Sequence, residues 1–155
     1  MADLQTSNLS FTVNSNVCDV EVGHSVLLID LLRDQLGLKG TKRSCDMQVC
    51  GTCTVLVDDL PVSSCTMLAL DVEGRQVTTI EGVSTNGKLS RVQQAFVDHA
   101  ALQCGFCTPG MVLAVTALLK SNPHPSEADI RHYLHGNICR CTGYIKILEA
   151  VKSLV

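Results

Sequence analysis

Nine cysteines in 155 residues constrain this chain more than any other feature of its sequence. No export signal is visible at the N-terminus, so we expect a cytoplasmic protein whose thiols stay reduced. Metal ligation is then the leading interpretation of the cysteines. Eight of them fall into two groups of four. The first group is Cys45, Cys50, Cys53 and Cys65, and the second group is Cys104, Cys107, Cys139 and Cys141.

The first group has the spacing C-x4-C-x2-C, and eleven residues separate its third cysteine from its fourth. This is the spacing of plant-type [2Fe–2S] ferredoxins. Gly51 lies between Cys50 and Cys53, where it lets the backbone approach a cluster closely. Structural zinc sites favour two separate C-x2-C pairs, and this group contains only one. We therefore interpret the first group as the ligands of one [2Fe–2S] cluster.

The second group has the spacing C-x2-C, a gap of 31 residues, then C-x-C. On spacing alone, zinc is a fair competitor. Each cysteine pair lies just before an expected helix N-terminus, where free N–H groups and partial positive charge suit an anionic centre. This placement and the neighbouring first group favour a second [2Fe–2S] cluster. The ninth cysteine, Cys18, shares the strand phase of Val20 and Val22, so we expect a small buried core residue.

The first half of the chain has the patterns of strands and turns around a single helix. Alternating apolar residues on either side of Asn14-Ser15-Asn16 predict an opening hairpin. Ser25 is a candidate N-cap for a helix that ends at Gly37. The expected elements are strands at 9–13, 18–22, 54–57, 60–64 and 76–80 and a helix at 26–36. Together they predict an α+β fold with one helix on a small sheet.

The second half changes character after Ser84-Thr85-Asn86-Gly87, which has the composition of a linker. Four helical segments are expected near 89–100, 108–119, 126–135 and 144–154. Pro109 suits the first turn of the second helix, and Ser126-Glu127-Ala128-Asp129 resembles a capping box at the start of the third. Each cysteine pair of the second group lies between two of these helices. If the two helix pairs pack about a pseudo-twofold axis, the cysteine pairs converge.

Several function classes are disfavoured by composition. The net charge of −3 and only five aromatic residues argue against nucleic-acid binding, and no apolar run is long enough to span a membrane. No phosphate-binding GxGxxG or GxxxxGK motif is present. His132 and His135 lie three apart on a helix but lack an evident third metal ligand, so we expect a solvent-facing pair. Lys42-Arg43 beside Cys45 fits either a solvated pair or a compensation of cluster charge.

Four motifs carry a resemblance to a known family. They are Ser44–Val55, Ser64–Thr66, Gln103–Gly110 and Gly136–Tyr144, and they cover nearly the whole chain in the family's order. On these motifs the chain resembles the small iron–sulfur subunit of the molybdenum hydroxylases, the xanthine dehydrogenase family. Gln48 departs from the pattern, because this stretch often carries Gly. We expect a local backbone adjustment at Gln48, with ligation intact.

The resemblance implies an N-terminal ferredoxin-like β-grasp domain over residues 7–83 and a C-terminal four-helix domain over 84–155, each with one [2Fe–2S] cluster. It also implies a large partner subunit with a molybdenum–pterin cofactor and a medium one with FAD, in a heterotrimer that often dimerises. Such complexes typically hydroxylate a carbon of an N-heterocycle or aldehyde, and a few relatives oxidise carbon monoxide or reduce an aromatic thioester. This chain would relay single electrons between molybdenum and flavin and would not be catalytic by itself.

The resemblance further suggests that the second cluster faces the molybdenum cofactor, with Gln103 and Cys141 in contact with the pterin, and that the first cluster faces the flavin. Alternatively, Gln103 only caps or solvates a loop. Two other functions stay open: a free-standing ferredoxin and a zinc-stabilised interaction module. The helical domain argues against a diffusing carrier, and colour separates an iron–sulfur protein from a zinc protein.

Overall fold

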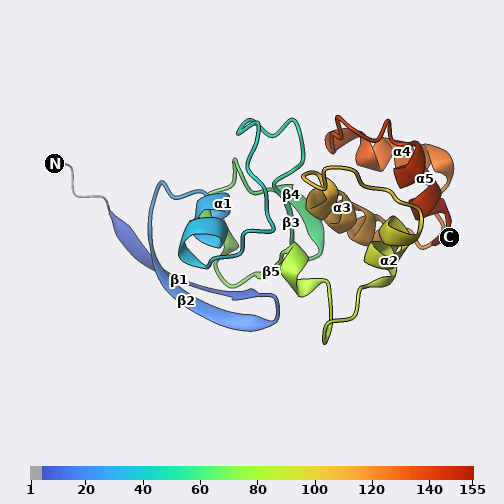
Figure 1. Cartoon of the computed structure of the whole chain (residues 1–155). Coiled ribbons are helices and arrows are strands. Elements are labelled where there is room, and N and C mark those ends of the chain that lie inside the picture. Colours follow the sequence, from blue (N-terminus) through green and yellow to red (C-terminus); the bar gives the residue numbers. More distant parts are fainter. Residues whose placement is uncertain (1–4) are drawn as a thin grey trace.

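A two-stranded hairpin opens the fold in the computed structural model, which describes residues 5–155 (Figure 1). Strands β1 (Thr6–Val13) and β2 (Asn16–Gly23) pair antiparallel, with Phe11 opposite Cys18. The connecting Asn14 and Ser15 have φ of 49° and 69°, the left-handed conformation that two-residue hairpin loops favour. Cys18 is half-buried rather than fully buried, because β2 is an edge strand of the sheet.

The sheet has five strands in the order β2-β1-β5-β3-β4. Its remaining strands are β3 (Thr54–Val57), β4 (Leu60–Ser63) and β5 (Gln76–Thr78), and only β1 and β5 pair parallel. The short 3₁₀ turns η2 (Ala69–Val72) and η3 (Ile80–Gly82) precede and follow β5. Strand β5 ends at Thr78, before the expected Ile80, because the chain turns into η3.

One face of the sheet packs against a short helix. Helix α1 (Leu28–Asp30) continues as the wider turn η1 (Leu31–Gln35), and Leu28, Leu31 and Leu32 are completely buried. The expected cap at Ser25 is wrong: Leu27 is the N-cap, without a side-chain hydrogen bond. The Leu28 N–H instead donates to the Met67 carbonyl at 2.8 Å. A backbone carbonyl from far along the chain therefore takes the place of the expected serine cap.

The second half is helical, and it contains α2 (Arg91–Asp98), α3 (Thr108–Ser121), α4 (Glu127–Tyr133), the 3₁₀ turn η4 (Leu134–Gly136) and α5 (Ile145–Lys152). Ser90 and Ser126 cap α2 and α4 through complete capping boxes. Helix α3 is the central element, since eight of its residues are buried. The expected α+β class and the four helices of the second half are confirmed.

Helix α3 joins the two halves of the molecule. Its residues Leu113 and Ala117 pack on Leu56 of β3, while the rest of its buried face contributes to the core formed with α2, α4 and α5. Figure 1 shows α3 between the sheet and the other helices. Within residues 5–155, no helix is long and apolar enough to cross a membrane.

Candidate metal centres

The loop between η1 and β3 carries the first three cysteines, and Cys65 follows β4. Backbone N–H groups of the loop point at the Cys45 sulfur: those of Val49 and Cys50 both lie 3.4 Å from it. Hydrogen bonds from the Met47, Cys50 and Val49 N–H groups lower the pKa of Cys45 to about 6. The loop therefore stabilises a thiolate, the form that ligates metal.

The other two cysteines of this group form its buried side. Cys53 and Cys65 are 2% and 3% exposed, whereas Cys45 and Cys50 are half-buried. Burial raises the pKa of Cys65 to about 11, although the Gln48 N–H donates to its sulfur. A bound metal displaces such a proton, because cysteine ligates as the thiolate. The first group thus has one half-buried and one buried pair of thiols.

The backbone at Gln48 is left-handed, with φ of 59°, a conformation that glycine adopts freely and other residues seldom adopt. Its N–H still reaches Cys65, and its side-chain Oε1 accepts from the Thr66 hydroxyl at 3.2 Å.

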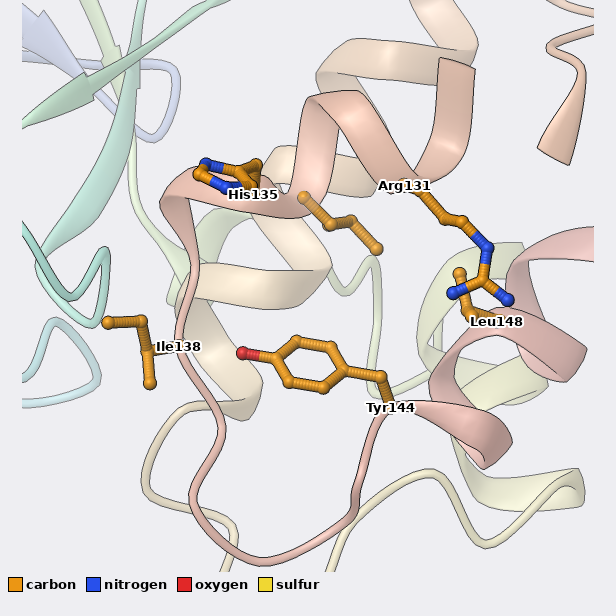
Figure 2. Close-up of a pocket in the computed structure, with 6 residues that line it drawn as sticks. Arg131, His135, Ile138, Tyr144 and Leu148 are labelled. Carbon is orange, nitrogen blue, oxygen red and sulfur yellow. The ribbon is translucent and has the colours of Figure 1, made fainter. Parts of the chain in front are cut away.

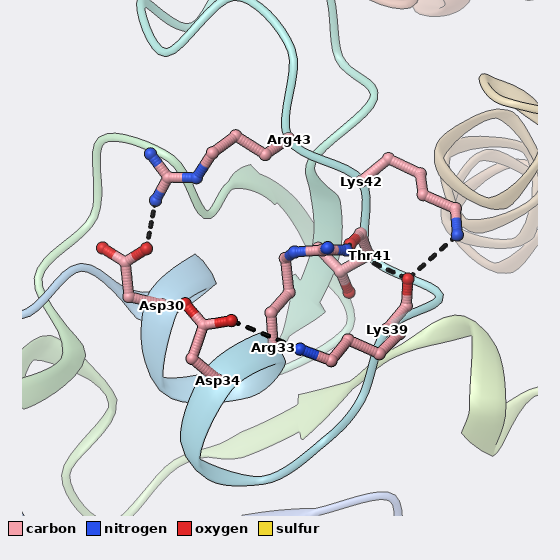
Figure 3. A network of polar contacts seen from close by, with 7 residues as sticks. All are labelled: Asp30, Arg33, Asp34, Lys39, Thr41, Lys42 and Arg43. Atoms are coloured by element: carbon pink, nitrogen blue, oxygen red, sulfur yellow. Dashed lines mark hydrogen bonds and ion pairs between the residues drawn. The ribbon is translucent and has the colours of Figure 1, made fainter.

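A polar network anchors this loop to the adjacent helix (Figure 3). Arg43 forms ion pairs with Asp30 and, at 3.1 Å, with Asp46. The Lys42 ammonium donates to the Lys39 carbonyl at 3.0 Å. Arg43 is therefore a partly exposed but paired charge, since two carboxylates hold it and tie the loop to α1.

The second group of cysteines comes together from two connections, one before α3 and one before α5. The Cys104 and Cys141 sulfurs lie 3.6 Å apart, and both residues are exposed. Cys107 and Cys139 contact each other on the inner side, where burial raises the pKa of Cys107 to about 12. Burial also opposes ionisation of Cys139, but hydrogen bonds from Thr142, the Cys141 N–H and the Cys107 thiol together outweigh it and lower the pKa. The Thr142 hydroxyl lies 3.1 Å from that sulfur.

All eight thiols thus meet two by two. The contacting pairs are Cys45 with Cys50, Cys53 with Cys65, Cys104 with Cys141, and Cys107 with Cys139. Within residues 5–155, no three His, Cys, Asp or Glu side chains are arranged to hold one metal ion. A [2Fe–2S] cluster contains two irons, each of which takes two protein thiolates, whereas structural zinc gathers four ligands around one ion. The donor set fits two-iron clusters.

The two cysteine loops touch each other directly. The Ile138 N–H donates to the Cys50 carbonyl at 2.9 Å. A Cβ added at Gly51 would lie 2.3 Å from the Gly136 carbonyl oxygen, and one added at Gly110 would lie 2.4 Å from the Gly51 oxygen. Only glycine permits these approaches, so the first loop packs against both the start of α3 and the chain before Cys139.

Three residues near the second group were not singled out from the sequence, namely Asn137, Thr142 and Tyr144. The Tyr144 hydroxyl accepts from the Cys139 N–H at 2.9 Å and donates to the Asn137 carbonyl at 3.2 Å. It also borders a cavity of about 440 Å³, where Figure 2 shows the hydroxyl directed toward Ile138. The signal for all three was their place in the motif Gly136–Tyr144, beside two cysteines.

The remaining candidates lie at the surface. Gln103 is exposed beside Cys104, at the outer end of the second group. His132 and His135 are both exposed, as expected for a solvent-facing pair, and His135 lines the rim of the cavity in Figure 2.

Comparisons with known proteins agree with this architecture. Residues 11–79 match the family model of the 2Fe-2S iron-sulfur cluster binding domain, and residues 79–152 match that of the [2Fe-2S] binding domain. The chain is 43% identical to the caffeine dehydrogenase subunit gamma of Pseudomonas sp. (strain CBB1), over 94% of this chain and 89% of that one. It is 44% identical to the xanthine dehydrogenase iron-sulfur-binding subunit of Escherichia coli O157:H7, over 95% and 93%.

Solved structures give the same result. Quinoline 2-oxidoreductase from Pseudomonas putida 86 superposes with a TM-score of 0.92 at 44% identity, over 95% of this chain and 91% of that chain. Aldehyde oxidoreductase from Desulfovibrio gigas also gives 0.92, at 40% identity, over 96% of this chain but 17% of that larger one. The caffeine dehydrogenase and xanthine dehydrogenase relatives of this chain are subunits of oxidoreductase complexes. The chain belongs to the small iron–sulfur subunits of the molybdenum hydroxylases, in the xanthine dehydrogenase family.

Proposed function

We propose that this chain binds two [2Fe–2S] clusters and relays single electrons between a molybdenum–pterin centre on a large partner subunit and FAD on a medium one. The observation that carries the proposal is the pairwise meeting of all eight thiols at two sites joined by a hydrogen bond. A [2Fe–2S] cluster, when bound, accepts and releases one electron at a time. Two such sites in series suit the division of an electron pair into single steps.

The chain's own residues would hold each cluster. Cys45, Cys50, Cys53 and Cys65 would ligate the first, and Cys104, Cys107, Cys139 and Cys141 the second. Backbone N–H groups aimed at the Cys45 sulfur, and the Thr142 donors at Cys139, stabilise the thiolate form of these ligands.

The exposed ends of the two sites support an orientation. Cys104, Cys141 and Gln103 form an exposed edge that would face the pterin, where the Gln103 amide can both donate and accept. The rim of the first loop carries Met47 and Val49, which are 68% and 54% exposed and would pack against the FAD subunit.

Metal content tests the two clusters. Analysis should give about four iron and about four acid-labile sulfide per chain. Cys50→Ser should remove only the first cluster, and Cys107→Ser only the second, as judged by visible absorption and electron paramagnetic resonance. Stoichiometric zinc in a colourless protein, or about two iron per chain, would contradict the proposal.

The orientation has its own test. Gln103→Ala should slow electron transfer from molybdenum to this chain in the assembled complex while both clusters remain bound. Gln35→Ala, which removes an equally exposed amide on η1, should not. Loss of the second cluster in Gln103→Ala would mark the residue as structural, and a complex in which Cys45 or Cys50 lies nearer the pterin than Gln103 would reverse the order.

We retain the domain boundary at 83 and 84, the heterotrimer, a cytoplasmic location and the lack of turnover by the isolated chain as parts of this proposal. A free-standing ferredoxin would need only the first site, so the second site favours a fixed relay. Substrate-dependent dye reduction by the purified chain, free of other subunits, would contradict this assignment.

A further inference from the structure

Asn137 lies where the two cysteine loops meet, and only 7% of it is exposed. Its Nδ2 donates to the Gly51 carbonyl at 3.0 Å and to the Thr54 hydroxyl at 3.2 Å. The next residue, Ile138, donates its N–H to the Cys50 carbonyl at 2.9 Å. The Asn137 side chain therefore holds the first loop in place. It does so right beside the hydrogen bond from the Ile138 N–H to the Cys50 carbonyl.

A continuous bonded route follows from these contacts. Cys50 is a proposed ligand of the first cluster and Cys139 of the second, and Ile138 is bonded covalently to Cys139. The route from one ligand sulfur to the other crosses a single hydrogen bond and is otherwise covalent. Tyr144 fixes its far side, because its hydroxyl binds both the Asn137 carbonyl and the Cys139 N–H.

We propose that Asn137 is a positioning residue for electron transfer between the two cluster sites. Tunnelling falls off steeply with the gap between bonded groups, so the rate depends on keeping the hydrogen bond from Ile138 to Cys50 closed. One electron leaves one cluster and enters the other, and Asn137 itself exchanges neither an electron nor a proton. This inference rests on the proposed function.

The local geometry separates positioning from folding. The Thr54 hydroxyl donates to the Gly51 carbonyl at 2.7 Å without any help from Asn137. Removing the Asn137 amide therefore leaves the first loop with its own hydrogen bonds and with its Gly51 carbonyl still satisfied. The variant loses only the hydrogen bonds from the Asn137 amide that join the two loops. The electronic coupling between the clusters should therefore weaken while both clusters stay bound.

The experiment uses the full chain with both clusters bound. In the fully reduced chain, the magnetic interaction between the clusters is measured by electron paramagnetic resonance. After photoreduction by less than one electron per chain, redistribution between the clusters is followed by rapid freezing. Asn137→Ala and Asn137→Asp should weaken the interaction and slow redistribution several-fold, with iron and sulfide unchanged in both variants and both reduction potentials unchanged in Asn137→Ala.

A matched pair of threonines provides the control. Thr54→Val removes the hydroxyl that accepts from Asn137, so it should weaken coupling in the same direction by a smaller factor. Thr41→Val replaces an equally buried hydroxyl of the first loop that has no hydrogen-bond partner among residues 5–155, so it should change nothing.

Unchanged coupling and redistribution in an Asn137→Ala chain that holds both clusters would overturn the inference and leave the proposed function intact. Loss of a cluster in both Asn137 variants would also overturn it, since the residue would then serve cluster binding. A wild-type chain that lacks two clusters would overturn the proposed function instead.

Discussion

At the scale of single residues, left-handed backbone conformations give the first cysteine loop its shape. Asp46, Gln48 and Gly51 have φ of 53°, 59° and 67°. Such conformations turn successive N–H groups toward one side of the loop, where the cysteine sulfurs accept from them. Glycine adopts this conformation freely, whereas Gln48 adopts it at a cost of about 1–2 kcal/mol.

Gln48→Gly should therefore stabilise the protein. Glycine's extra freedom in the unfolded chain costs about 0.4–1 kcal/mol, which is less than the strain that the substitution relieves. We therefore expect the free energy of unfolding to rise by less than about 1 kcal/mol. Thermal unfolding of the cluster-loaded chain measures it. Val49→Gly is the control, because Val49 does not have a positive φ and should lose stability. A Gln48→Gly protein less stable than wild type would show that the hydrogen bond to Thr66 outweighs the strain.

At the scale of elements, two helices of the second half, α2 and α4, begin at matched capping boxes. Ser126 and Asp129 cap α4, and Ser90 and Gln93 cap α2, with each serine hydroxyl accepting from the N–H three residues later. The difference between them is charge. Hydrogen bonds from the Ser126 hydroxyl and N–H hold the pKa of Asp129 below its ordinary value, while Gln93 does not titrate.

Ser126→Ala and Ser90→Ala should each cost about 1 kcal/mol at pH 7. Only the first loss should depend on pH. Because the folded-state pKa of Asp129 is lowered, its contribution is present above the unfolded pKa of about 3.9 and vanishes as pH falls through the lowered folded value. The cost of Ser126→Ala should thus shrink in acid, and that of Ser90→Ala should stay constant in urea unfolding followed by circular dichroism. Equal pH dependence of both variants would contradict this account.

Most of these elements could be predicted from sequence, because their signals are local. Alternating apolar residues predicted the hairpin, and Pro109 and Ser126 predicted two helix starts. The cap at Ser25 failed because the Leu28 N–H is satisfied by Met67, far along the chain. The contact of Asn137 with Gly51 was equally invisible, since it joins residues 86 positions apart. Cysteine spacing predicted which thiols gather, but it carried no information on how the two sites touch.

At the scale of the whole molecule, two glycines allow the halves to meet at the cysteine loops. Gly110, in the first turn of α3, lies against the Gly51 carbonyl, so the helix that fills the second core also abuts the first loop. A Cβ added at Gly110 would meet backbone atoms of Gly51 and Thr52, and no flexible side chain could move to make room.

Gly110→Ala should destabilise the whole chain. The added methyl meets the backbone, where overpacking costs about 1–3 kcal/mol, against a gain of about 1 kcal/mol in helix propensity. We expect a net loss of about 1 kcal/mol in thermal unfolding. Gly136→Ala is the control, because its Cβ would point into open space, and it should stay within about 0.5 kcal/mol. A neutral Gly110→Ala would mean that α3 can shift away from the first loop.

Helix α3 also governs the order in which the chain can mature. Synthesis delivers the sheet first, but the outward side of β3 at Leu56 has no cover until Leu113 and Ala117 have emerged and docked. A nascent chain that ends before α3 therefore exposes the apolar side of β3, as incompletely synthesised proteins commonly expose hydrophobic surface. We therefore expect a first half truncated before α3 to aggregate, because the apolar surface at Leu56 stays uncovered.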